Sequence, residues 1–200
     1  RHYGFRGGYG KGVAKVEPIY LSSRDCGLSW REVLVTGPTA GAMVRSPWSG
    51  DFLTILCKTG HAHSDEWHTV HEACQGTGFF LHRSAQGCEG PFTSTLVSRH
   101  TGFLARQPMP LCHRRRWVQP MQRQVEGRYC PGVLLSDDDG VTWREVMLPS
   151  PPPHRVEWPH KGVRWQNYGC EPTVAELSDG RLWMLIRTSQ DCHYEAFSKD

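Results

Sequence analysis

A glutamate and an arginine flank a predicted β-hairpin near the C-terminal end of the sequence, where their side chains could act together. Ser178-Asp179-Gly180 is a three-residue turn signal with glycine at the left-handed position. Counting outward from this turn in steps of two places Glu171 opposite Arg187, and opposed residues of paired strands have Cβ atoms about 4.5–5.5 Å apart. A β-bulge would shift this register by one residue. The two residues form either a structural ion pair or a carboxylate beside a guanidinium whose planar fork can bind a carboxylate.

The elements that must position this pair are indicated by a repeated octapeptide. Both copies fit Ser-x-Asp-x-Gly-x-[Ser/Thr]-Trp, and Arg-Glu-Val follows each of them directly. A third copy begins at residues 198–200. Repeats of this kind are typical of stacked supersecondary units. The defining residues of the two complete copies are Ser23, Asp25, Gly27 and Trp30, and Ser136, Asp138, Gly140 and Trp143.

Each copy predicts a β-hairpin corner. The aspartate can accept hydrogen bonds from backbone N–H groups of its own turn, and the glycine two residues later can supply a positive φ. The tryptophan is expected to anchor the outgoing strand by burying a large ring. After the second corner, three strand-like runs predict an antiparallel meander over 173–177, 182–188 and 194–197.

The octapeptide resembles the Asp box of sialidases and related β-propellers. The segment from Cys170 to Arg187 is similar to the sialidase segment that carries a catalytic glutamate and a carboxylate-binding arginine. The resemblance is strongest over 130–200, is weaker over 12–36 and is absent over about 43–128. It implies an all-β fold, a partial β-propeller of four-stranded antiparallel blades. At about 40–50 residues a blade, the chain holds roughly four of a sialidase's six blades.

The resemblance implies that the full-length protein is an exo-glycoside hydrolase that removes terminal sialic acid from glycoconjugates. Glu171 matches the glutamate that assists a tyrosine nucleophile, and Arg187 matches one of three arginines that bind the sugar carboxylate. We expect the acid/base aspartate, the nucleophilic tyrosine and the other two arginines outside residues 1–200, so this fragment alone is expected to be inactive. No cofactor is implied.

Two other functions remain open. One is a non-catalytic Asp-box propeller that binds glycans or proteins, and the other is a propeller glycosidase or lyase acting on another acidic sugar. A binding module has no need of Glu171, so the predicted hairpin favours an enzyme. The polar and aromatic loop before Glu171 either lines the sugar site or is an ordinary surface loop, and we select Arg164, Asn167 and Tyr168 from it as substrate contacts. Rim or core positions are expected for Gln190, His193 and Tyr194.

The domain organisation is predicted to be a single incomplete propeller over 1–200. Ser23 and Ser136 are 113 positions apart, which is more than one blade, so two blades with a missing or eroded box between them are expected. The stretch 57–130 shows little strand alternation and no clean blade. It is either a divergent blade with long loops or a stretch read in the wrong frame. Retranslating the source DNA in the other frames would distinguish the two.

Metal sites are not predicted. The cluster His61, His63, His68, His71, Glu72 and Cys74 has no second ligand pair at zinc spacing, and the run Asp137–Asp139 lacks the spacing of a calcium loop. None of the eight cysteines forms a Cys-x-x-Cys pair, and free thiols are expected.

The composition narrows the possible partners. A net charge of +3 with 22% charged residues does not indicate nucleic acid, and no apolar run reaches the ~18 residues of a membrane span. The predicted partner is a sialylated or other acidic glycan. No signal peptide is visible, and the secreted, periplasmic and cytoplasmic compartments all remain open.

Overall fold

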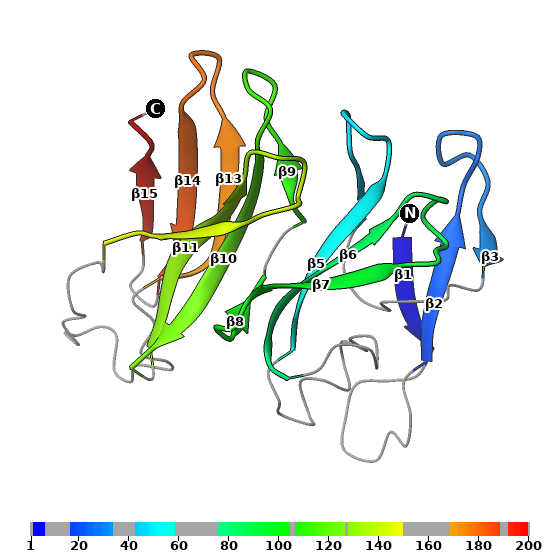
Figure 1. Ribbon diagram of the computed structural model, residues 1–200, viewed down its shortest axis with the longest axis horizontal. Helices are drawn as coiled ribbons and strands as arrows, with labels where there is room; N and C mark the ends of the chain where they lie inside the picture. The colour runs from blue at the N-terminus through cyan, green and yellow to red at the C-terminus, as the bar shows by residue number, and fades with distance from the viewer. Residues whose placement is uncertain are drawn as a thin grey trace.

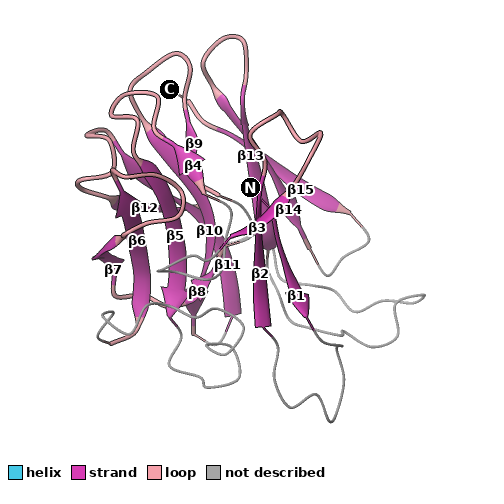
Figure 2. Ribbon diagram, turned by 90° about the vertical axis from the view of Figure 1, so that its right-hand side faces the viewer, coloured by secondary structure: helices cyan, strands magenta, loops and turns pink. Residues whose placement is uncertain are grey.

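The computed structural model describes residues 2–6, 17–33, 43–58, 76–104, 107–126, 128–149, 169–188 and 192–199. Within these ranges every regular element is a β-strand, and every pair is antiparallel (Figures 1 and 2). The strands form four sheets that follow one another along the chain and do not close into a ring. The predicted all-β, partial propeller is therefore confirmed. No helix in the described ranges is long and apolar enough to cross a membrane.

The first two sheets come from the N-terminal half. One contains β1 (His2–Arg6), β2 (Glu17–Ser22) and β3 (Arg31–Val33), in that order. The other contains β4 (Val44–Arg45), β5 (Phe52–Lys58), β6 (Gly78–Ser84) and β7 (Thr93–Ser98), also in chain order.

The last two sheets position the Glu171–Arg187 hairpin. The third contains β8 (Gly102–Phe103), β9 (Met109–Pro110), β10 (Trp117–Val125), β11 (Arg128–Ser136) and β12 (Arg144–Met147). Its order is β12-β11-β10-β8, with β9 also paired to β10. The fourth contains β13 (Cys170–Glu176), β14 (Leu182–Arg187) and β15 (His193–Phe197), which confirms the predicted meander. Only the second sheet has the expected four strands within the described ranges.

A serine at or just beyond the end of one strand marks the same corner in all four sheets. Ser23 follows β2, Ser84 ends β6, Ser136 ends β11 and Ser198 follows β15. Successive serines are 61, 52 and 62 positions apart. The β6–β7 corner keeps the serine, whose Oγ accepts from the N–H of Gln86 at 3.2 Å, but has glutamine where the aspartate would stand. This corner is the eroded box expected between Ser23 and Ser136.

The expectation that 57–130 contains no clean blade is wrong for the described part of that stretch. It contains β6 and β7, which complete the second sheet, and β8 to β10, which belong to the third. Six consecutive residues of β10, from Trp117 to Gln122, are buried. A strand covered on both faces does not show the polar–apolar alternation by which a strand is recognised in a sequence. Whether the stretch is divergent or read in the wrong frame stays a prediction.

Neighbouring sheets pack through apolar faces that continue from one to the next. Trp117, Met121 and Leu134 join Leu53 and Phe79 in one buried cluster between the second and third sheets. On the opposite face of the third sheet, its other apolar residues pack with residues of β14; this cluster is Leu111, Val118, Val133, Leu135, Met184 and Ile186. Alternate side chains of β10 and β11 therefore pack on opposite faces of the third sheet, one set against the second sheet and the other against the fourth.

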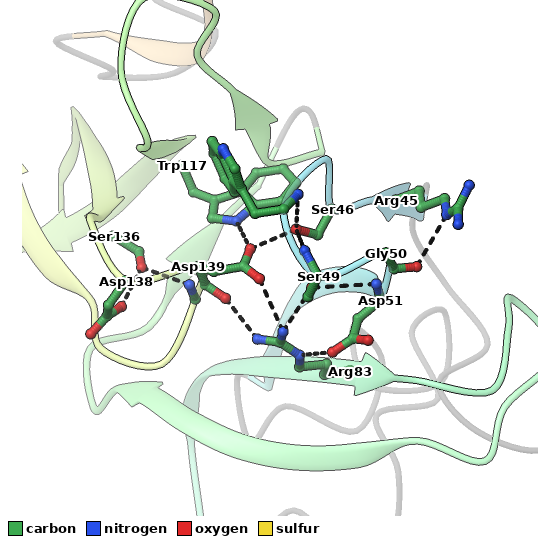
Figure 3. Close-up of polar contacts among 12 residues, drawn as sticks. Arg45, Ser46, Ser49, Gly50, Asp51, Arg83, Trp117, Ser136, Asp138 and Asp139 are labelled. Atoms are coloured by element: carbon green, nitrogen blue, oxygen red, sulfur yellow. Dashed lines mark hydrogen bonds and ion pairs between the residues drawn. The ribbon is translucent and has the colours of Figure 1, made fainter.

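A buried aspartate also connects the second and third sheets (Figure 3). Asp139 Oδ1 accepts from Ser46 Oγ at 2.7 Å and from Trp117 Nε1 at 2.9 Å. Its Oδ2 lies 3.1 Å from Arg83 Nη2, and Arg83 Nη1 donates to its carbonyl oxygen at 2.6 Å. Arg83 also pairs with Asp51 at 2.5 Å. We call this cluster, formed by Asp139, Arg83, Ser46, Trp117 and Asp51, the inter-sheet hub.

Asp137, two residues before Asp139, provides a matched control for a stability test of the hub. Burial alone would raise the pKa of Asp139, but hydrogen bonds from Trp117 and Ser46 and the charge of Arg83 hold it below its ordinary value. Asp139→Asn keeps a residue that tolerates the φ of +58° and should lower the free energy of unfolding by about 2 kcal/mol. The exposed Asp137, paired with Arg116, should lose about 1 kcal/mol or less on the same change. Urea unfolding of both variants measures the difference.

The stability that Asp139 contributes should depend on pH in one direction. Because the folded-state pKa of Asp139 lies below the unfolded value of about 4, its contribution is present above about pH 4 and is lost as the pH falls through the folded-state pKa. The gap between wild type and Asp139→Asn should therefore close under acid conditions. Equal stability of the two proteins at pH 7 would show that the hub does not hold the sheets together.

Candidate functional site

The Glu171 and Arg187 side chains form an ion pair at one end of the β13–β14 hairpin. Arg187 Nη1 lies 2.6 Å from Glu171 Oε2, and the two side chains are 40% and 41% exposed. The hairpin turn lies at the opposite end of these strands, on the same side of the molecule as the β2–β3 corner (Figure 1). The pair is thus reachable from solvent, on the side away from that corner.

The register that produces this contact differs from the predicted one. Pairing runs as expected from the turn to Thr173, which lies opposite Leu185. A β-bulge follows, and Arg187 lies opposite Cys170 instead of Glu171. Two residues of β13, Glu171 and Pro172, therefore face a single position of β14. The predicted register is wrong by one residue, although the predicted neighbours still meet.

The backbone of Glu171 explains how the contact survives the bulge. Its φ is +48°, in the left-handed region, so the side chain leaves the strand in a direction that regular β geometry would not give. Such a φ costs a residue other than glycine about 1–2 kcal/mol, and conformations of this kind persist only where the surroundings fix them.

The surroundings of the bulge are closely packed. Cys170 and Pro172, on either side of Glu171, are buried. A Cβ placed on Gly169 would come within 2.8 Å of Ile186 and 3.1 Å of Pro131, so the chain reaches β13 against two neighbouring strands. The N–H of Glu171 donates to Oε1 of Gln122 on β10 at 2.5 Å.

The electrostatics of the site suit recognition of an anion. The hydrogen bond from Arg187 to Glu171 raises the pKa of the guanidinium above its already high value, so the arginine stays charged. A guanidinium has five N–H donors, which is more than one carboxylate oxygen can use. The site can therefore bind a carboxylate on Arg187 and accept a proton on Glu171.

Of the other predicted site residues, two lie within the described part of the chain. Arg164, Asn167, Tyr168 and Gln190 lie outside the described residues, as does the whole histidine cluster from His61 to Cys74. His193 lies opposite Arg187 in the β14–β15 ladder, at the rim of the site. Tyr194 packs against the core between the third and fourth sheets. Among the described residues no group of three or more His, Cys, Asp or Glu is placed to hold a metal ion, and the seven described cysteines are free thiols.

The two octapeptide loops have matching hydrogen bonds. In the first, Asp25 accepts from the N–H and hydroxyl of Ser29 at 2.9 and 2.6 Å, and Ser23 Oγ accepts from the N–H of Gly27 at 2.8 Å. In the second, Asp138 accepts from the N–H and hydroxyl of Thr142 at 2.8 and 2.5 Å, and Ser136 accepts from Gly140 at 2.8 Å. The bonds from the Ser29 hydroxyl and N–H lower the pKa of Asp25 to about 2.

The role expected of the tryptophans is only partly right. Both indoles close their loops by donating from Nε1 to the carbonyl of the loop glycine at 3.0 Å. Trp143 is partly buried against the core, but Trp30 is 41% exposed. The tryptophan therefore fixes the loop by a local hydrogen bond, and burial of its ring is not required.

A cavity of about 320 Å³ lies where β4, β9 and β13 converge. Val44, Met109 and Thr173 contribute one wall residue from each of these strands. Thr173 is two residues beyond Glu171 in the sequence, but neither Glu171 nor Arg187 lines the cavity.

Comparison with known proteins supports the fold. No family model matches the sequence, and no curated protein matches it. Among solved structures, the NanB sialidase of Streptococcus pneumoniae superposes with a TM-score of 0.53 at 13% identity, over 93% of this chain and 45% of the sialidase. The chain thus spans less than half the length of that enzyme. An endo-arabinase of Bacteroides thetaiotaomicron gives a TM-score of 0.47 at 14% identity, over 98% of this chain and 69% of the arabinase.

The left-handed backbone of Glu171 predicts an unusual order of stability. Glu171→Gly removes the side chain but also relieves the positive φ, whereas Glu171→Ala keeps the strain. The glycine variant should be more stable than the alanine variant by about 1 kcal/mol, as measured by urea unfolding. An alanine variant as stable as the glycine variant would mean that residue 171 does not adopt this backbone conformation in solution.

Proposed function

We propose that the complete protein is a glycoside hydrolase of the sialidase type, which removes terminal sialic acid from glycoconjugates. Arg187 binds the sugar carboxylate, and Glu171 accepts a proton from the nucleophile. The single observation that carries the proposal is the exposed 2.6 Å contact between Glu171 and Arg187, which persists despite a bulge and a left-handed backbone. A merely structural surface pair contributes little to stability and would not require a strained residue.

The chemistry follows from the two groups. An acidic sugar brings a second carboxylate to the guanidinium, which can hold it with two parallel N–H donors. Glu171 then takes the proton of a hydroxyl nucleophile, a tyrosine in sialidases, and makes the hydroxyl oxygen more nucleophilic. The nucleophile's oxygen bonds to the anomeric carbon as the glycosidic C–O bond breaks, and the leaving oxygen takes a proton from the acid/base aspartate expected outside residues 1–200. Water then cleaves the bond between the nucleophile and the sugar and releases the sugar. Arg164, Asn167 and Tyr168 belong to this proposal as substrate contacts on sequence grounds alone.

The decisive experiment measures turnover of a fluorogenic sialoside by the complete protein and its variants. Glu171→Gln should lower kcat about 100-fold or more with little change in KM, because it removes a proton acceptor. Arg187→Met should lower kcat/KM about 100-fold, since a charged hydrogen bond to the substrate is lost. Near-normal turnover by Glu171→Gln would exclude this residue from the mechanism.

A second surface ion pair provides the matched control. Arg181 and Asp179 lie 2.8 Å apart at the turn end of the same hairpin, with exposures of 49% and 51%. Asp179→Asn should leave the turnover unchanged. A parallel assay with a fluorogenic glucuronide tests the other acidic sugars. Binding of sialosides without any turnover by the wild-type protein would instead support the non-catalytic propeller.

A further inference from the structure

The amide of Gln122 lies beneath the site and belongs to a neighbouring sheet. Gln122 is on β10, is 5% exposed, and its Oε1 accepts the hydrogen bond from the N–H of Glu171 at 2.5 Å. Strands β10 and β13 are not partners in any ladder. This contact therefore passes between sheets, from a buried side chain to the backbone of a proposed active-site residue.

The bulge leaves one backbone donor that the hairpin cannot use. Neither Glu171 nor Pro172 has a partner in the β13–β14 register, and proline has no N–H. The N–H of Glu171 is thus the only donor that the two bulge residues contribute. Gln122 supplies the acceptor for this donor in a part-buried hydrogen bond, and leaving a backbone donor unpaired is costly where water is excluded.

The backbone of Gln122 is itself held on both sides. Gln122 lies opposite Phe103 of β8 and Pro131 of β11. A Cβ on Gly102 would come within 1.9 Å of the carbonyl oxygen of Gln122, so β8 lies against β10 at this residue and only a glycine fits there. The backbone of Gln122 is thus held by β8 and β11, and its side chain makes the hydrogen bond to β13.

From these contacts we infer that Gln122 is a positioning residue for Glu171. By accepting the N–H at the bulge, it holds residue 171 in the left-handed conformation and so directs the carboxylate toward Arg187. The role of Gln122 in turnover rests on the function proposed above. Its role in fixing the bulge does not, and it can be measured on this chain without a substrate.

Hydrogen exchange of the Glu171 amide, followed by NMR, tests the positioning directly. Gln122→Met removes the acceptor at similar size and should speed exchange at Glu171 about tenfold or more. The amide of Ala175, which lies opposite Trp183 at a hydrogen-bonded position of the β13–β14 ladder, should stay protected. Gln122→Glu keeps an oxygen acceptor and should retain the protection. Gln119→Met, which replaces another buried amide of the same strand, should leave exchange at Glu171 unchanged. Unchanged exchange at Glu171 in Gln122→Met would overturn the inference.

Loss of protection throughout β13 in Gln122→Met would mean that this variant is unfolded. Exchange of the Glu171 amide in Gln122→Glu would then test the inference. A protected Glu171 amide in Gln122→Glu supports the inference. Fast exchange at Glu171 with Ala175 still protected contradicts it.

Turnover by the complete protein gives the second readout. Gln122→Met should lower kcat about tenfold or more with KM nearly unchanged, and Gln122→Glu should restore most of the loss. Wild-type kcat in Gln122→Met would overturn the catalytic part of the inference. A wild-type protein without glycosidase activity would refute the proposed function alone, because the exchange experiment judges the positioning role independently.

Discussion

The site depends on one backbone hydrogen bond, from the N–H of Glu171 to the buried amide of Gln122. The bulge at Glu171 and Pro172 takes both residues out of the β13–β14 ladder, and residue 171, with its left-handed φ, places its carboxylate against Arg187. Neither feature is favourable in isolation. They persist because buried neighbours and an acceptor from the adjoining sheet fix the chain at this position.

Contacts between sheets also join the second, third and fourth sheets. The third sheet packs against the second through Trp117 and Met121 and against the fourth through Val118. The inter-sheet hub adds polar contacts to the first of these interfaces. Gln122 belongs to the same strand, so β10 both packs between two sheets and supports the site.

Local sequence signals predicted the turn and the octapeptide loops, because their hydrogen bonds join residues at most four positions apart. The meander was predicted from three strand-like runs that follow one another closely along the chain. The features that were missed depend on distant residues. Gln122 lies 49 positions from Glu171, and Ser46 lies 93 positions from Asp139. The bulge did have a local signal. Pro172 stands within a strand pattern, where proline is confined to edges, first positions and bulges.

The two octapeptide loops differ in the burial of the residue before the loop glycine. Cys26 and Asp139 hold this position with φ values of +57° and +58°, yet the cysteine is exposed and the aspartate is buried in contact with another sheet. The loop's own hydrogen bonds do not involve this side chain. A side chain at this position can therefore form a contact between sheets, as Asp139 does with Ser46. The hydrogen bonds that close the loop do not depend on it.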